Sequence, residues 1–126
     1  MRLSKQLLLI DDDESIREMI SFVFDHQDYQ IKAVADAKNI NKLLEEFEPD
    51  LVMVGTKNAG EICQDLKLLS TIEQVTLILL SSAVIHEDVP DCGQDLLIAK
   101  PFDIFYLKRM VEILIHRGIE ASNQPS

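Results

Sequence analysis

Hydrophobic residues occur along the chain in five short runs separated by longer amphipathic segments. Four runs are continuously apolar and too short for helices, at residues 6–10, 51–54, 76–80 and 96–99, and a weaker run covers 29–34. A continuous apolar run predicts a strand that is covered on both faces, as in a parallel sheet. The five runs therefore predict five buried strands.

The segments between these runs show the periodicity of amphipathic helices. Apolar residues recur at helical spacing at Ile16, Met19, Ile20 and Val23, at Ile40, Leu43, Leu44 and Phe47, and at Ile104, Leu107, Val111, Leu114 and Ile115. Asp36 and Asp103 stand where the N-caps of two helices are expected. Strands and helices therefore alternate, which predicts an α/β fold of five β-α units.

The segment before the last strand interrupts this alternation. Pro90 and Gly93 follow one another closely within residues 83–95, and neither residue favours a helix interior. The fourth helix is therefore expected to be short or missing.

The end of the chain is expected to differ from the rest. Gly118 follows the last apolar positions and is a plausible helix-terminating glycine, and the residues after it are mostly polar. We therefore expect one domain at 1–118 and a polar C-terminal tail or the start of a linker at 119–126.

Composition narrows the class of protein. The chain has 126 residues, 47% hydrophobic and 27% charged, which suits one soluble domain. A net charge of −10 argues against direct binding to nucleic acid or to anionic membranes. No run approaches the roughly 20 apolar residues of a membrane span, and no signal-peptide cleavage site follows the first apolar run, so we expect a cytoplasmic protein.

The cysteines and histidines show no pattern of a metal site. Cys63 and Cys92 fit no C-x-x-C motif, and the three histidines are scattered along the chain. Structural thiols are the expected role of the two cysteines.

Polar residues follow the predicted strands at the points where the strands end. They are Asp11, Asp12 and Asp13 after the first strand, Ser81 and Ser82 after the fourth, and Lys100 after the fifth. The residue after the third strand is Gly55, which has no side chain. Ligands of an open parallel sheet bind outside the carboxyl ends of its strands. Carboxylates suit Mg²⁺, and a hydroxyl with an ammonium group can hold phosphoryl oxygens. The pattern predicts half of a phosphoryl-transfer site.

The stretches LLLIDDDESIREMI, PDLVMV, LILLSS and AKPFD, in this order, resemble the receiver domain of bacterial two-component response regulators over almost the whole chain. The resemblance implies a flavodoxin-like, doubly wound (βα)5 sandwich with a five-stranded parallel sheet in the order 2-1-3-4-5. It also implies an acidic Mg²⁺ pocket of Asp11 and Asp12, phosphoryl contacts from Ser81 and Lys100, and a cis peptide bond before Pro101.

Gly55 departs from this family at its most important position. The residue that ends the third strand of a receiver is the aspartate that accepts phosphate from a histidine kinase, and glycine offers no carboxylate. Asp50 should lie at the opposite edge of the sheet, Thr56 lacks an activating base, and Glu61 reaches the pocket only if the short loop folds that way. Leu97 stands where the family has an aromatic switch residue. The resemblance is therefore to a pseudo-receiver.

The acidic pair needs a positive partner even without phosphorylation. Lys100 can balance Asp11 and Asp12, so the Mg²⁺ site is expected to be weak or lost, and no other cofactor is expected. The alternative is that the two aspartates cap the first helix or are simply solvated.

The expected function is that of a non-enzymatic signalling module that acts by phosphorylation-independent protein–protein interaction. Expected partners are signalling proteins such as a histidine kinase or an output domain, with a monomer or weak homodimer as the oligomeric state. Tyr106, Met110 and Ile113 form an apolar flank of the last helix and are the interface candidate. The alternative is a broad core face with the same residues half-buried.

Three other functions compete with this interpretation. One is a receiver that is phosphorylated at a substitute residue. Another is a haloacid-dehalogenase-like phosphatase with Asp11 and Asp13 as its D-x-D motif, although that family needs a further acidic strand after the lysine. The third is a flavodoxin-like FMN binder, which is disfavoured because the three aspartates would repel a phosphate.

Overall fold

The computed structural model describes residues 4–67, 75–82 and 93–123. In chain order its elements are β1 (Lys5–Ile10), α1 (Glu14–Val23), β2 (Tyr29–Val34), α2 (Ile40–Glu46), β3 (Leu51–Val54), α3 (Ala59–Lys67), β4 (Thr76–Ser81), β5 (Leu96–Ala99) and α4 (Ile104–Asn123). The five strands form one parallel sheet in the order β2-β1-β3-β4-β5.

This architecture confirms the predicted fold class, including the strand order. Each apolar run forms a strand, and the predicted and observed bounds differ by at most one residue. Four helices occur among the described residues. The expected short or missing fourth helix falls largely on 83–92, outside the described part of the chain, and the described residues 93–95 are not helical.

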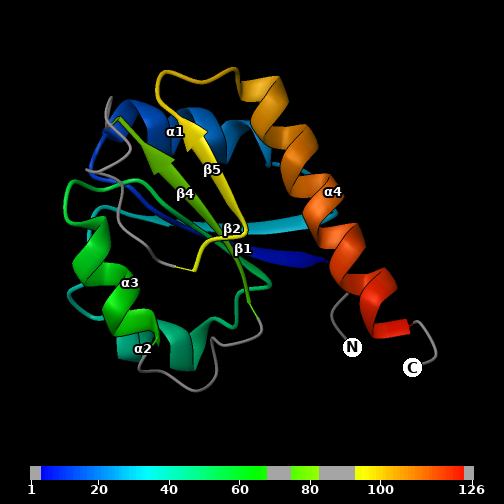
Figure 1. Ribbon diagram of the computed structural model, residues 1–126, viewed down its shortest axis with the longest axis horizontal. Coiled ribbons are helices and arrows are strands. Elements are labelled where there is room, and N and C mark those ends of the chain that lie inside the picture. Colours follow the sequence, from blue (N-terminus) through cyan, green and yellow to red (C-terminus); the bar gives the residue numbers. More distant parts are fainter. Residues whose placement is uncertain (1–3, 68–74, 83–92, 124–126) are drawn as a thin grey trace.

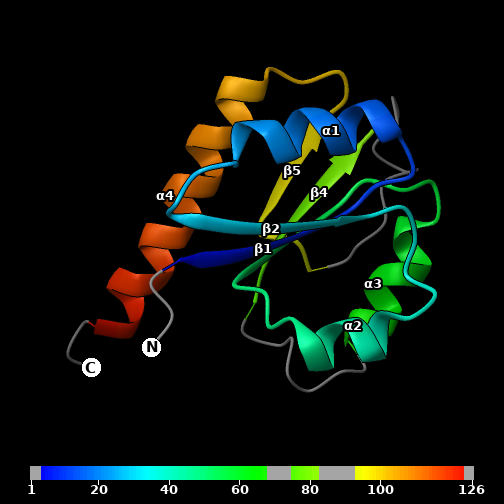
Figure 2. The same ribbon diagram turned by 180° about the vertical axis from the view of Figure 1, so that it is seen from behind.

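Helices cover both faces of the sheet, which explains the continuous apolar runs. Figures 1 and 2 show α1 and α4 on one side and α2 with α3 on the other. Alternate strand residues divide between the two cores: Leu7, Leu9 and Met53 pack on the α1/α4 side, whereas Leu8 and Val52 pack on the α2/α3 side. Burial on both faces makes these strands hydrophobic at every position.

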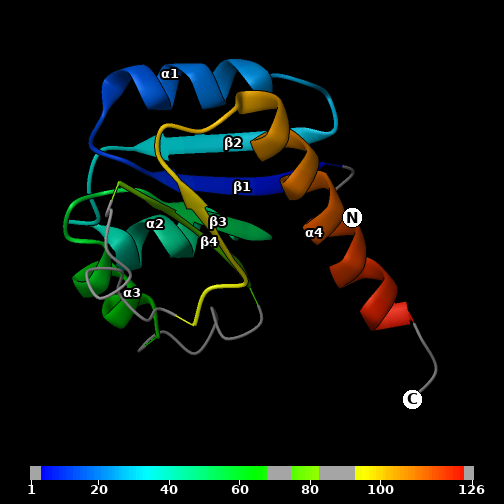
Figure 3. The same cartoon turned by 45° about the horizontal axis from the view of Figure 1, so that its top comes forward.

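The edge strand β2 is covered on one side by α1, which runs along it (Figure 3). Phe24, just after α1, packs edge to face on Tyr29 with the ring centroids 5.1 Å apart. This contact links the end of α1 to the start of β2.

No membrane-spanning helix is found among the described residues, since none combines the required length with sufficient hydrophobicity.

The predicted N-cap of the last helix is confirmed. Asp103 precedes α4, and its carboxylate accepts hydrogen bonds from the amides of Phe105 and Tyr106 at 2.8 and 3.3 Å. These bonds satisfy two of the amides that the first helical turn leaves without a partner.

Two local predictions are wrong. Asp36 does not cap a helix, because α2 begins only at Ile40 and the Asp36 side chain instead accepts from the amide of Lys38 in the preceding turn. Gly118 does not end the last helix, because α4 continues to Asn123. A glycine inside a helix costs about 1 kcal/mol relative to alanine, so it weakens the helix without having to end it. The division of the chain at 118 stays a prediction.

One cysteine also differs from expectation. Cys63 on α3 is buried in the α2/α3-side core and is disulfide-bonded, so the prediction of an unpaired thiol is wrong at this position. Cys92 lies outside the described residues. The Lys100–Pro101 peptide bond is cis, as the resemblance to receivers implied.

At the amino ends of the strands, two aspartates join neighbouring strands in the same way. The amide of Gln6 donates to Asp50 Oδ2 at 2.8 Å, and the Asp50 amide donates to the Gln6 carbonyl at 2.7 Å. Leu77 and Asp95 repeat this pair of bonds, both at 2.8 Å. Asp50 therefore lies at the edge opposite to Gly55, as the strand length predicted.

Candidate functional site

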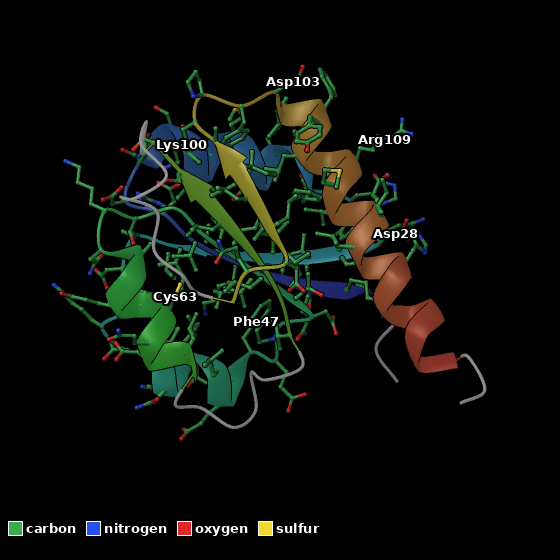
Figure 4. All side chains as sticks on the ribbon, viewed as in Figure 1. Asp28, Phe47, Cys63, Lys100, Asp103 and Arg109 are labelled. Carbon is green, nitrogen blue, oxygen red and sulfur yellow. The ribbon has the colours of Figure 1, made fainter. Side chains whose placement is uncertain are left out.

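Strand pairing brings the predicted site residues to one edge of the sheet. Ile10 of β1 pairs with Val54 of β3, so the next residues, Asp11 and Gly55, emerge side by side. Ser81 ends β4, and its carbonyl accepts from the amide of Lys100 at 2.7 Å, just after β5. Figure 4 shows Lys100 where the arrows of β4 and β5 end.

A cavity of about 430 Å³ opens at this edge. Its polar lining includes Asp12, Asp13, Thr56, Lys57, Ser81, Ser82 and Lys100, with Gly55 among them. The residues predicted from the ends of four strands therefore share one cavity, and Asp11, which contacts Lys100, is completely buried.

Asp11 and Lys100 form the central contact of the site. Lys100 Nζ lies 2.9 Å from Asp11 Oδ2, and the two side chains are 15% and 0% exposed. The same ammonium donates to the carbonyl oxygen of Gly55 at 2.9 Å. A charged hydrogen bond in such a buried place is stronger than one at the surface, and each ion depends on the other for its solvation.

The remaining polar atoms of Asp11 are also engaged. Its Oδ1 accepts from the amide of Asp13 at 2.9 Å, and its backbone carbonyl accepts from the Arg17 guanidinium at 2.8 Å. Asp11 is therefore held by the lysine, by the following turn and by the first helix.

The three aspartates have different roles, although the sequence places them next to one another. Asp13 is the N-cap of α1, since its carboxylate accepts from the amides of Ser15 and Ile16 at 2.9 and 3.3 Å. The alternative in which Asp11 and Asp12 cap this helix is therefore wrong. Asp12 is exposed and lines the cavity, whereas Asp11 is the buried partner of Lys100.

Gly55 leaves space that Asp11 and Lys100 fill. A Cβ atom at position 55 would overlap Asp11 Oδ2, and it would lie 3.0 Å from Asp11 Cγ and 3.2 Å from Lys100 Nζ. Real Cβ atoms do not approach a neighbour so closely, so a side chain at 55 and this position of Asp11 exclude each other. The sequence identified Gly55 as a missing carboxylate but did not show that the space is occupied.

The residues present do not fit the Mg²⁺ ion of the receiver family. Such an ion needs several free oxygen ligands in near-octahedral geometry. Both carboxylate oxygens of Asp11 already accept hydrogen bonds, one of them from an ammonium group, and Gly55 supplies no carboxylate. Within the described ranges no group of three or more histidine, cysteine or acidic side chains is arranged to hold a metal.

The substitute acceptors considered from the sequence are poorly placed. Asp50 is bonded to Gln6 at the other edge, and Glu61 is an exposed residue in the first turn of α3. Thr56 is 7% exposed, and among the described residues its hydroxyl oxygen has no hydrogen-bond partner. A hydroxyl without a base is a weak nucleophile.

The described residues give no support to the rival phosphatase interpretation. Its metal ligands would come from a further strand after Lys100, and in the described part of the chain only α4 follows. The cavity is lined by Asp12 and Asp13, which does not favour the phosphate of FMN.

The residues outside the pocket occupy the predicted elements. Leu97 on β5 is half-buried and packs against the core on the α2/α3 side. On α4, Tyr106 and Ile113 are 47% and 37% exposed, and Met110 is half-buried. Phe22 and Phe105 are 82% and 76% exposed, which the spacing of apolar residues along the helices does not reveal.

The chain is similar in sequence to regulatory proteins. No protein-family model matches the chain. It is 28% identical over 119 residues to the transcriptional regulatory protein AfsQ1 of Streptomyces coelicolor, which covers 89% of this chain and 52% of the relative. It is 32% identical over 106 residues to the regulatory protein VirG of Agrobacterium fabrum, covering 78% and 41%.

A solved structure is similar to this chain over almost its whole length. The crystal structure of a response regulator receiver modulated diguanylate cyclase from Pelobacter carbinolicus superposes with a TM-score of 0.81 at 26% identity, covering 95% of this chain and 99% of that one. The chain spans about half the length of the curated relatives named above.

Proposed function

We propose that this chain, whose fold and relatives are those of response regulator receiver domains of two-component signalling, works as a pseudo-receiver without enzymatic activity. It would signal through protein contacts that do not depend on phosphorylation. One observation carries the proposal: Gly55 directly follows β3 and lies beside Asp11 at the carboxyl edge of the sheet. In the receiver family that the chain resembles, the residue that ends this strand is the acceptor aspartate.

The contacts of Lys100 support this proposal. In the receiver family the corresponding lysine contacts the phosphoryl group. Here the ammonium group of Lys100 donates hydrogen bonds to Asp11 and to the Gly55 carbonyl within the pocket. Two of the three N–H donors of this ammonium group are therefore engaged within the pocket. The site residues Asp11, Asp12, Gly55, Ser81 and Lys100 would therefore keep the fold of the pocket without its chemistry.

Signalling would then depend on surfaces that are present all the time. The apolar flank of α4 formed by Tyr106, Met110 and Ile113 is the proposed contact surface, because Tyr106 and Ile113 are exposed in a domain of net charge −10. The proposed partners are signalling proteins of the cytoplasm, such as a histidine kinase or an output domain. Direct binding of nucleic acid is not proposed, because the charge opposes it.

Phosphotransfer tests the proposal directly. The protein is incubated with Mg²⁺ and acetyl phosphate, and intact mass spectrometry follows the addition of a phosphoryl group, with a receiver that has the acceptor aspartate as the positive control. We expect no addition to this chain. Addition of one acid-stable or acid-labile phosphoryl group would overturn the proposal, and peptide mapping would then identify the substitute residue.

Two variants test the contact surface separately. Tyr106→Glu places a charge on the proposed flank, and Arg109→Glu places one on an exposed position of the same helix. We expect Tyr106→Glu to weaken self-association or the binding of a cognate kinase or output domain, and Arg109→Glu to have a smaller effect. Equal binding by both variants would remove the surface from the proposal.

A further inference from the structure

We propose that Gly55 is a positioning residue for Asp11, and that the ammonium group of Lys100 is the resident cation of the pocket in place of Mg²⁺. Glycine at position 55 then does more than remove the acceptor carboxylate, because the Asp11–Lys100 ion pair occupies the space that a side chain would need. This inference deepens the proposed function and rests on it for its meaning in signalling. Its physical content can be tested independently.

Position 55 has no space for a side chain while Asp11 keeps its position. Any side chain at position 55 begins with a Cβ atom, and this atom would overlap Asp11 Oδ2. Position 55 is itself buried, so the clash cannot be relieved by moving the new atom toward solvent without displacing the strand end. Glycine is therefore the residue that fits while Asp11 keeps its position.

The Asp11 side chain cannot move away from position 55 without a large loss of stability. Its Oδ1 is bonded to the Asp13 amide and its Oδ2 to Lys100, and the carboxylate is completely buried. A rotation that makes space at 55 would break both bonds. A buried carboxylate without partners is strongly destabilising, so the ion pair and the glycine depend on each other.

Lys100 also balances the charge of the pocket. A receiver pocket needs a cation because several carboxylates meet there. Lys100 Nζ supplies this charge at 2.9 Å from Asp11, and it bonds the Gly55 carbonyl at the same distance. One ammonium group thus contacts two oxygen atoms from two adjacent strand ends.

A consequence follows for repair of the site. In Gly55→Asp, the new side chain would displace Asp11 and compete with it for Lys100. The variant would regain the acceptor carboxylate, but the ion pair of the pocket would be disrupted. Restoring the family residue is therefore expected to be insufficient for phosphorylation.

A double-mutant cycle tests the coupling between positions 55 and 11. Gly55→Ala is measured in the wild type and in an Asp11→Ala background, by urea unfolding of the full chain followed by circular dichroism. In the wild type we expect the folding equilibrium constant to fall by about tenfold or more. In the Asp11→Ala background, where the overlapping carboxylate is gone, the same change should cost about threefold or less.

Gly60→Ala on α3 is the matched control. It adds the same atom within a helix, where alanine is the better helix former, and it should show the same effect in both backgrounds. If Gly55→Ala costs the same in both backgrounds, the inference is wrong. If Asp11→Ala does not fold, the cycle is repeated with Asp11→Ser, which also removes the overlapping Oδ2, and the same two outcomes decide.

Phosphotransfer to Gly55→Asp separates this inference from the proposed function. No phosphoryl addition to Gly55→Asp is expected, and efficient addition to this variant alone would overturn the resident ion pair while leaving the pseudo-receiver intact. Addition to the wild type would instead overturn the proposed function, whatever the result of the cycle.

Discussion

The two edges of the sheet use aspartates in different ways. At the amino edge, Asp50 and Asp95 accept from backbone amides of neighbouring strands, and each bond belongs to a reciprocal pair. At the carboxyl edge, Asp11 is buried against one lysine ammonium. Backbone amides are fixed by the strands, whereas a lysine side chain is a single removable group. The amino edge therefore tolerates a change at one residue better than the carboxyl edge.

The largest expected effect is at the carboxyl edge. Lys100→Met leaves Asp11 buried without its cation, which should lower the free energy of unfolding by about 3–5 kcal/mol. Chemical unfolding followed by circular dichroism measures this loss. Lys57→Met is the control, because Lys57 also lines the cavity but is exposed, and it should change stability by less than about 0.5 kcal/mol. Equal losses in the two variants would contradict the importance of the ion pair.

A smaller effect is expected at the amino edge. Asp50→Ala removes the acceptor of the Gln6 amide and should cost about 1–2 kcal/mol, because that amide is left in a partly buried place. Hydrogen exchange should become faster at the Gln6 amide, whereas exchange at Gly55 on the other edge should change little. A loss as large as that of Lys100→Met would remove the difference between the edges.

The first helix provides a test among the adjacent aspartates. Asp13→Ala removes the N-cap of α1 and should cost about 1 kcal/mol, whereas Asp12→Ala should be nearly neutral. The Asp11 contact to the Asp13 amide survives in the first variant, because it uses the backbone. Thermal unfolding of both variants checks the order, and a larger loss in Asp12→Ala would reverse our assignment of the two residues.

The smallest effect is expected at Asp95. Its carboxylate makes the same bond to Leu77 that Asp50 makes to Gln6, but it lies at an exposed position where water can replace it. Asp95→Ala should therefore cost about 0.5 kcal/mol, less than Asp50→Ala. Unfolding curves of the two variants measured side by side give the comparison, and the opposite order would show that burial does not govern these bonds.

The sheet was predictable because burial on both faces makes strands such as Leu51–Val54 apolar at every position. Helix ends were less predictable. Asp36 carries a cap-type side chain that serves a local turn instead, and Gly118 lies inside a helix that continues past it. Asp13 could have been recognised as a cap, since it directly precedes the amphipathic segment.

The membership of the site was also predictable, because consecutive parallel strands bring their ends to one edge. The contacts within it were not. That Asp11 occupies the space above Gly55 depends on a side-chain rotamer and on the reach of Lys100, and neither is encoded in the spacing of the residues. Sequence therefore locates the pocket, and only the structure shows that Asp11 and Lys100 occupy the space a side chain at position 55 would need.

The most direct test of the central claim is an amide NMR titration of the protein with Mg²⁺ and then with beryllofluoride, a mimic of the phosphoryl group. A pocket in which Lys100 pairs permanently with Asp11 predicts no saturable shifts at Asp11, Asp12, Ser81 or Lys100. Saturable beryllofluoride shifts that spread from these residues would contradict the account, because they would show that the pocket still receives a phosphoryl group.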